Sequence, residues 1–140
     1  MKASWWGCLF LLLLAGCSSD DSMKKIDPYI FLHDNSSKVW MVDKLMLNKN
    51  DYTPLRFRNR QLVVFHKSQN AYFYRIHELG DKQGLKTYFW LDREKDEFGF
   101  QFAQDEWVFE IKQLSRTRVV LKPKRGRYPY TIVLIPFPEY

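Results

Sequence analysis

Cysteine is nearly absent from this sequence. The 140 residues contain two cysteines, Cys8 and Cys17, and both lie at the N-terminal end. Residues 18–140 therefore carry no thiol for a disulfide or for a cysteine-based zinc site. The body of the chain must be stabilised by its hydrophobic core, and a chain of this length can bury a sufficient core without covalent cross-links.

Glycine and histidine are also sparse, which argues against several kinds of catalytic site. The six glycines are scattered, so there is no glycine-rich phosphate-binding loop and no G-x-S-x-G turn. None of the three histidines, His33, His66 and His77, has a partner at metal-ligand spacing. The acidic residues of 92–97 alternate with basic ones and lack the order of a calcium loop. We expect no enzyme activity, no cofactor and no metal site.

The sequence contains no apolar run long enough to span a bilayer, which takes roughly 20 residues. Its longest run, from Trp5 to Ala15, follows Lys2 and ends in small residues, as is typical of a secretory signal. Leu14-Ala15-Gly16-Cys17 resembles the lipobox of bacterial lipoproteins. The resemblance implies that residues 1–16 are removed and that Cys17 is lipidated. A signal cleaved elsewhere, or a first helix of the fold, is the alternative.

Residues 17–37 are predicted to form a lipidated tether. Ser18 stands where an aspartate would resemble an inner-membrane retention signal, and Asp20-Asp21 resembles an export signal of surface lipoproteins. We therefore expect a lipid anchor in the outer membrane, on its inner or outer leaflet. Within the tether, the apolar residues 29–32 are expected to pack back onto the domain, across one end of it.

The chain is basic, with a formal net charge of +6. The basic residues are spread along the chain rather than clustered, and an exported lipoprotein rarely meets nucleic acid, so we expect no nucleic-acid partner. The excess of positive charge could attract anionic lipid headgroups or acidic glycans, and it is equally compatible with an ordinary soluble surface.

From residue 38 onward, hydrophobic residues recur with a period of two, which predicts strands. Short polar turns separate them, and no helix is expected outside the signal. The predicted strands lie at 38–47, 61–65, 71–77, 86–92, 98–102, 107–114, 119–122 and 130–137. This spacing predicts an all-β fold, an antiparallel up-and-down meander of about eight strands that closes or nearly closes.

A family resemblance runs through these strands. It lies in residues 38–42 with Trp40, in 62–65, in Tyr88-Phe89-Trp90-Leu91-Asp92, and in the terminal strand pair 107–114 and 119–121. These segments resemble the small lipocalin-like lipoproteins of the Bacteroidota. The resemblance implies a single lipocalin-like β-barrel domain over residues 38–140. Without signs of catalysis we expect a non-catalytic binding role, and the resemblance keeps open a small hydrophobic or sugar ligand at the barrel mouth.

Aromatic residues make up 17% of the chain. They include Trp40, Trp90, Trp107, Phe98, Phe100, Phe102 and Phe109 at alternating positions, and we expect about three-quarters of them in the core. An interior filled in this way argues against a large cavity. The loop with Tyr52, Arg56, Phe57, Arg58 and Arg60 is instead a candidate surface for docking on a larger outer-membrane assembly, although it could be an ordinary surface loop. The sequence favours partner docking slightly over ligand capture.

Overall fold

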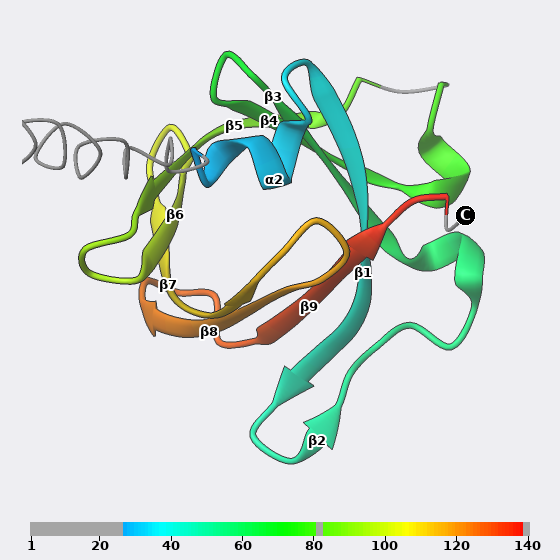
Figure 1. The fold of residues 1–140 in the computed structure, drawn as a ribbon. Coiled ribbons are helices and arrows are strands. Elements are labelled where there is room, and N and C mark those ends of the chain that lie inside the picture. The colour runs from blue at the N-terminus through cyan, green and yellow to red at the C-terminus, as the bar shows by residue number, and fades with distance from the viewer. Residues whose placement is uncertain (1–26, 81–82, 139–140) are drawn as a thin grey trace, which may run out of the picture.

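The computed structural model describes residues 27–80 and 83–138, and it shows an all-β protein (Figure 1). Nine antiparallel strands form one sheet, and eight of them close into a barrel. The strands are β1 (Ser37–Leu47), β2 (Asn50–Asp51), β3 (Gln61–His66), β4 (Asn70–Arg75), β5 (Leu85–Asp92), β6 (Glu97–Gln101), β7 (Glu106–Leu114), β8 (Val119–Arg125) and β9 (Thr131–Pro136). The predicted meander is confirmed.

Closure depends on β1, the longest strand. β1 pairs with β3 on one side and with β9 on the other, whereas β3 to β9 follow one another in sequence order. Its pairing with β9 shifts register between Val42 and Lys44. A bulge of this kind bends and twists a strand, as a strand that closes a barrel must. The short β2 lies outside the barrel, as a hairpin extension of β1.

The barrel interior is filled with aromatic side chains. Alternate residues of a strand point to opposite faces, so one set of each strand lines the interior. Phe98 and Phe100 of β6 are fully buried, and Phe109 of β7 and Phe65 of β3 pack beside Phe100 with ring centroids 6.1 and 6.0 Å from its own. Trp90 is an exception, because it lies on the outer face against Gly99, where a Cβ would come within 2.1 Å of its ring.

One end of the barrel is closed by a short helix, α2 (Tyr29–His33). The indole N–H of Trp40, fully buried in β1, donates to the Leu32 carbonyl at 2.9 Å. The Tyr29 hydroxyl accepts from the Leu91 amide at 2.8 Å. Residues 29–32 therefore pack across one end of the domain as predicted, but as a helix, which was not expected. Within 27–80 and 83–138, no helix is long and apolar enough to cross a membrane.

Candidate functional site: the open mouth of the barrel

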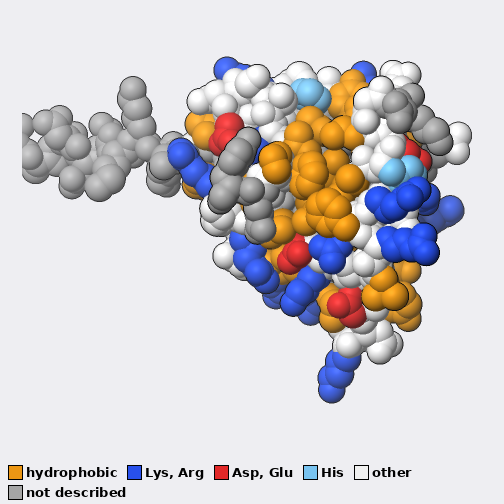
Figure 2. Space-filling view, turned by 90° about the vertical axis from the view of Figure 1, so that its right-hand side faces the viewer, with side chains coloured by type: hydrophobic (Ala, Val, Ile, Leu, Met, Phe, Trp, Pro, Cys, Tyr) orange, Lys and Arg blue, Asp and Glu red, His pale blue; other side chains and the backbone are white. Residues whose placement is uncertain are grey.

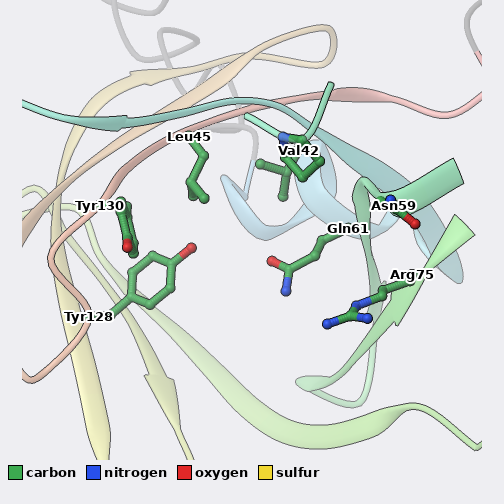
Figure 3. A pocket seen from close by; sticks show the side chains of 8 residues that line it. Val42, Leu45, Asn59, Gln61, Arg75, Tyr128 and Tyr130 are labelled. Atoms are coloured by element: carbon green, nitrogen blue, oxygen red, sulfur yellow. The ribbon is translucent and has the colours of Figure 1, made fainter. Parts of the chain in front are cut away.

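The end of the barrel opposite α2 holds a cavity of about 440 Å³ (Figure 3). This volume lies within the range usual for small-molecule sites. The cavity is lined by Val42, Leu45, Pro54, Asn59, Gln61, Arg75, Tyr128 and Tyr130. These residues come from β1, from the loop before β3, from the start of β3, from the end of β4 and from the loop between β8 and β9. The described residues that line the cavity include no carboxylate.

The polar wall of the cavity follows from strand alternation. Gln61 begins β3, Arg75 ends β4, and the two are register partners. One layer deeper on the same inward face, the partners are Val63 and Phe73, which belong to the core. The inward row therefore changes from apolar to polar at the mouth. Figure 3 shows the Gln61 amide and the Arg75 guanidinium both directed toward the side of the cavity that carries Tyr128 and Tyr130.

Aromatic rings form the floor and the opposite wall. The Tyr128 ring stacks on Trp107 with centroids 4.3 Å apart, and Trp107 packs on Phe102 at 4.4 Å. The Tyr130 ring meets Tyr128 edge-on at 5.3 Å. Burial, together with the neighbouring Tyr130, raises the pKa of Tyr128 to about 12. The Tyr128 phenol is therefore neutral near pH 7 and can donate its proton in a hydrogen bond.

The charge of the cavity comes from Arg75. No described carboxylate forms an ion pair with its guanidinium, and the nearby Glu78 carboxylate instead accepts a 3.4 Å hydrogen bond from the Arg75 backbone amide. Asn59 and Gln61 contribute neutral amides. Among the described residues that line it, the site thus combines one positive charge and no carboxylate with neutral donors and acceptors.

The loop that was predicted as a docking surface, residues 52–60, lies along this mouth. Tyr52 is half-exposed and its ring meets Tyr130 edge-on at 5.7 Å. Phe57, in the 3-10 turn η1 (Phe57–Asn59), is also half-exposed and packs against Phe137 with centroids 6.1 Å apart. The sequence interpretation missed Leu55, which is 101% exposed.

The three arginines of the loop have different surroundings. Arg60 turns toward the outside of β1, where its guanidinium lies 3.6 Å from an Asp43 carboxylate oxygen. Arg56 and Arg58 are exposed, and the Arg58 carbonyl contacts His77 Nδ1 at 2.9 Å. His77 belongs to a second 3-10 turn, η2 (Ile76–Glu78), so the two mouth loops touch. None of the three arginines lines the cavity.

Hydrophobic side chains also gather on the outside of the barrel, on the side where β1 and the end of β9 lie (Figure 2). One row of outward positions runs in register across β9, β1, β3 and β4, and a second row lies beside it. The rows are Ile135–Met41–Leu62–Tyr74 and Phe137–Val39–Val64–Tyr72. We call these eight residues the outer apolar face; Met41 and Leu62 within it are buried, and the other six are partly exposed. The contact between Phe57 and Phe137 joins it to the loop of residues 52–60.

The described residues offer no candidate metal centre, since no group of three metal-ligating side chains lies together in 27–80 or 83–138. The acidic segment 92–97 forms a turn in which an Asp92 carboxylate oxygen accepts from two backbone amides. Its last residue, Glu97, is buried on the outer face with Lys124 at 2.8 Å and Arg125 at 3.4 Å. The Lys124 hydrogen bond, together with both positive charges, lowers the pKa of Glu97.

Sequence interpretation also missed Gln61, Arg75, Tyr128 and Tyr130. The signal for Arg75 was present, because the period-two pattern places it on the same face as Phe73. Cys17, the predicted lipidation site, lies outside the described residues.

Comparisons with protein families, with curated proteins and with solved structures find no match to this chain.

Proposed function

We propose that this chain is a non-catalytic binding protein that holds a small ligand at the open mouth of its barrel. The observation that carries the proposal is the cavity of about 440 Å³, in which Gln61, Arg75 and Tyr128 converge beside the apolar Val42 and Leu45. A concave, partly apolar site with a few convergent polar groups is the usual form of a small-molecule site. The chain offers binding chemistry there, but no nucleophile paired with a base.

The ligand test uses the full chain, purified in detergent from an expressing bacterium, with bound small molecules extracted and identified by mass spectrometry. Gln61→Trp places a large ring in the cavity, whereas Lys112→Trp adds the same ring at an exposed outward position of β7. We expect a small molecule to co-purify with wild type and with Lys112→Trp, and to be lost from Gln61→Trp. Equal recovery from all three proteins, or from none, contradicts the proposal.

Membrane attachment is the second part of the proposal. The lipobox-like Leu14-Ala15-Gly16-Cys17 supports a lipid on Cys17, and several acyl chains together make anchoring effectively permanent. Ser18 and Asp20-Asp21 support the outer membrane as the destination. Labelled palmitate should enter the wild-type chain and not Cys17→Ser. Incorporation into the variant would contradict lipidation, and protease treatment of whole cells distinguishes the inner from the outer leaflet.

The outer apolar face supports a second candidate function, docking on a protein of the outer membrane. The face joins Phe57, and the exposed Arg56 and Arg58 flank Phe57 in the chain. Apolar residues beside arginine are typical of interface hot spots, and the positive charge selects a partner with an apolar patch bordered by acidic residues.

A mild-detergent pull-down tests docking with Arg56/Arg58→Glu and, as a control at the opposite end of the barrel, Arg116/Arg118→Glu. Docking is supported by a stoichiometric membrane partner that is lost only from the first variant. The contact surface of that partner should be acidic in cross-linking maps. A partner retained by both variants contradicts it. If light scattering instead detects a dimer of the chain, the occupant of the outer apolar face is a second copy and not another protein.

A further inference from the structure

We propose that the ligand of the mouth cavity is a small amphipathic anion, an oxyanion group attached to a short or flat apolar body. This inference rests on the proposed function, because it names the class of ligand for the same cavity. Three features of the cavity support it: its charge, its hydrogen-bonding groups and its depth.

The charge argument concerns Arg75. Its guanidinium is aimed into the cavity, forms no ion pair with any described residue, and shares the cavity lining with no described carboxylate. A guanidinium presents a planar fork of donors that matches carboxylate, sulfonate or phosphate oxygens. An oxyanion would therefore bring a negative charge that no described lining residue supplies, whereas a neutral sugar would not.

The hydrogen-bonding groups agree with this charge. The Tyr128 hydroxyl lines the cavity and carries its proton near pH 7, so it can donate to an oxyanion. The Gln61 amide, register partner of Arg75, adds N–H donors on the same wall. In Figure 3 the Gln61 and Arg75 groups are both directed toward the space between them and Tyr128. Oxygens placed there would meet donors from two sides.

The depth of the cavity limits the apolar body. Tyr128 stacks on Trp107, and Phe73 packs on Trp107 with centroids 6.4 Å apart, so aromatic rings occupy the barrel directly beneath the cavity. Still deeper, Phe100 is fully buried among other rings. A long acyl chain would have to displace this packed column. The apolar part must instead fit between Leu45, Pro54 and the Tyr130 ring.

A matched pair of fluorescent probes tests the class. Anilinonaphthalene sulfonate and phenyl-naphthylamine share one aromatic skeleton, and only the first carries an oxyanion. Titrations use the full chain in a non-ionic detergent, as wild type, Arg75→Gln and Arg118→Gln, the last being an exposed arginine at the opposite end. We expect Arg75→Gln to weaken sulfonate binding about tenfold, as for loss of a charged hydrogen bond, with the neutral probe and Arg118→Gln unaffected.

Two further measurements show where the probes bind and whether the ligand is a lipid headgroup or a free small molecule. Gln61→Trp should abolish binding of both probes, and sulfonate binding that survives this variant would place the probe elsewhere and overturn the inference. Phosphatidylglycerol vesicles are then added as competitors of the sulfonate probe, with phosphatidylcholine vesicles as the control. Displacement of the probe by phosphatidylglycerol alone, in wild type but not in Arg75→Gln, indicates a lipid headgroup as the ligand. Competition by soluble carboxylates alone indicates a free small molecule.

The outcomes separate the two proposals. The affinity could be equal for both probes, unchanged in Arg75→Gln and lost in Gln61→Trp. That result would support the proposed binding site but overturn the proposal that its ligand is an anion. Absence of binding by either probe, together with absence of any co-purified molecule, overturns the binding function itself. Raising the salt concentration should weaken only sulfonate binding, and only where Arg75 is present.

Discussion

The two ends of the barrel are made from the same alternating strands, yet their inward positions carry opposite chemistry. At the closed end, Trp40 and Leu32 are fully buried and joined by a hydrogen bond. At the open end, the inward positions are Gln61 and Arg75, which are exposed and reach a cavity. Stability therefore resides in the closed end and the aromatic middle, and binding chemistry is confined to the open end.

The largest expected effect tests the aromatic middle. Phe100→Ala removes a fully buried ring that contacts Phe65, Phe98 and Phe109, and leaves a cavity among rings that cannot collapse freely. We expect the free energy of unfolding to fall by about 3–5 kcal/mol, measured by guanidinium denaturation. A loss under about 1 kcal/mol would mean that the middle repacks easily, and the contrast with the open end would disappear.

The closed end is tested by Trp40→Phe. The variant keeps an aromatic ring but deletes the indole N–H, so the Leu32 carbonyl loses its 2.9 Å partner. We expect a loss of about 1–3 kcal/mol, the cost of leaving a buried polar group unsatisfied. Hydrogen exchange should also speed up in α2 and remain unchanged around Arg75. Unchanged exchange in α2 would show that other contacts hold the helix.

The closed end should also respond to pH through His33. This side chain is buried and its Nδ1 accepts from the Asn35 backbone amide at 3.0 Å, which requires the neutral ring. Burial lowers the pKa of His33 from 6.5; the nearby Lys67 lowers it further, while Asp27 and Asp34 oppose the shift.

Because the unfolded chain then binds the proton more readily than the folded one, stability should fall as the pH drops below about 6.5 and should level off below the folded pKa. Urea denaturation at about pH 7.5 and about pH 5.5 measures this slope. The slope should be smaller in His33→Gln and unchanged in His66→Gln. An equal slope in both variants would assign the effect to other groups.

The smallest expected effect belongs to the open end. Arg75 is exposed and has no described ion-pair partner, so Arg75→Gln should change the free energy of unfolding by no more than about 0.5 kcal/mol. Thermal unfolding without ligand is the measurement. A large loss of stability would mean that the guanidinium supports the fold, and the functional contrast between the two ends would weaken.

Much of the fold was predictable because strand alternation is a local property. The period-two pattern of residues 98–102 is enough to place Phe98 and Phe100 on one face, and the polar turns set the strand order of a meander. The same pattern does not decide the face of Trp90, since its neighbours Leu91 and Phe89 are equally apolar. Only the approach of Gly99 on β6 provides the outer groove in which that ring lies.

The predicted docking loop keeps its residues at the surface, but the structure divides them. Phe57 joins the outer apolar face, Tyr52 leans on Tyr130, and Arg60 is held by Asp43. No sequence rule joins positions so far apart, because these contacts depend on the pairing of β1 with β3 and with β9. The docking role of this loop and the lipid on Cys17 remain predictions from sequence.

By itself, the sequence determined the all-β class, the strand order and the aromatic interior, because each follows from alternation and turns along neighbouring residues. The tertiary structure alone decided which polar residues share the mouth. Gln61, Arg75 and Tyr128 lie far apart in the chain, and barrel closure brings them around one cavity. Closure is a long-range event, so the position of Arg75 in a cavity whose described lining has no carboxylate cannot be predicted from neighbouring residues.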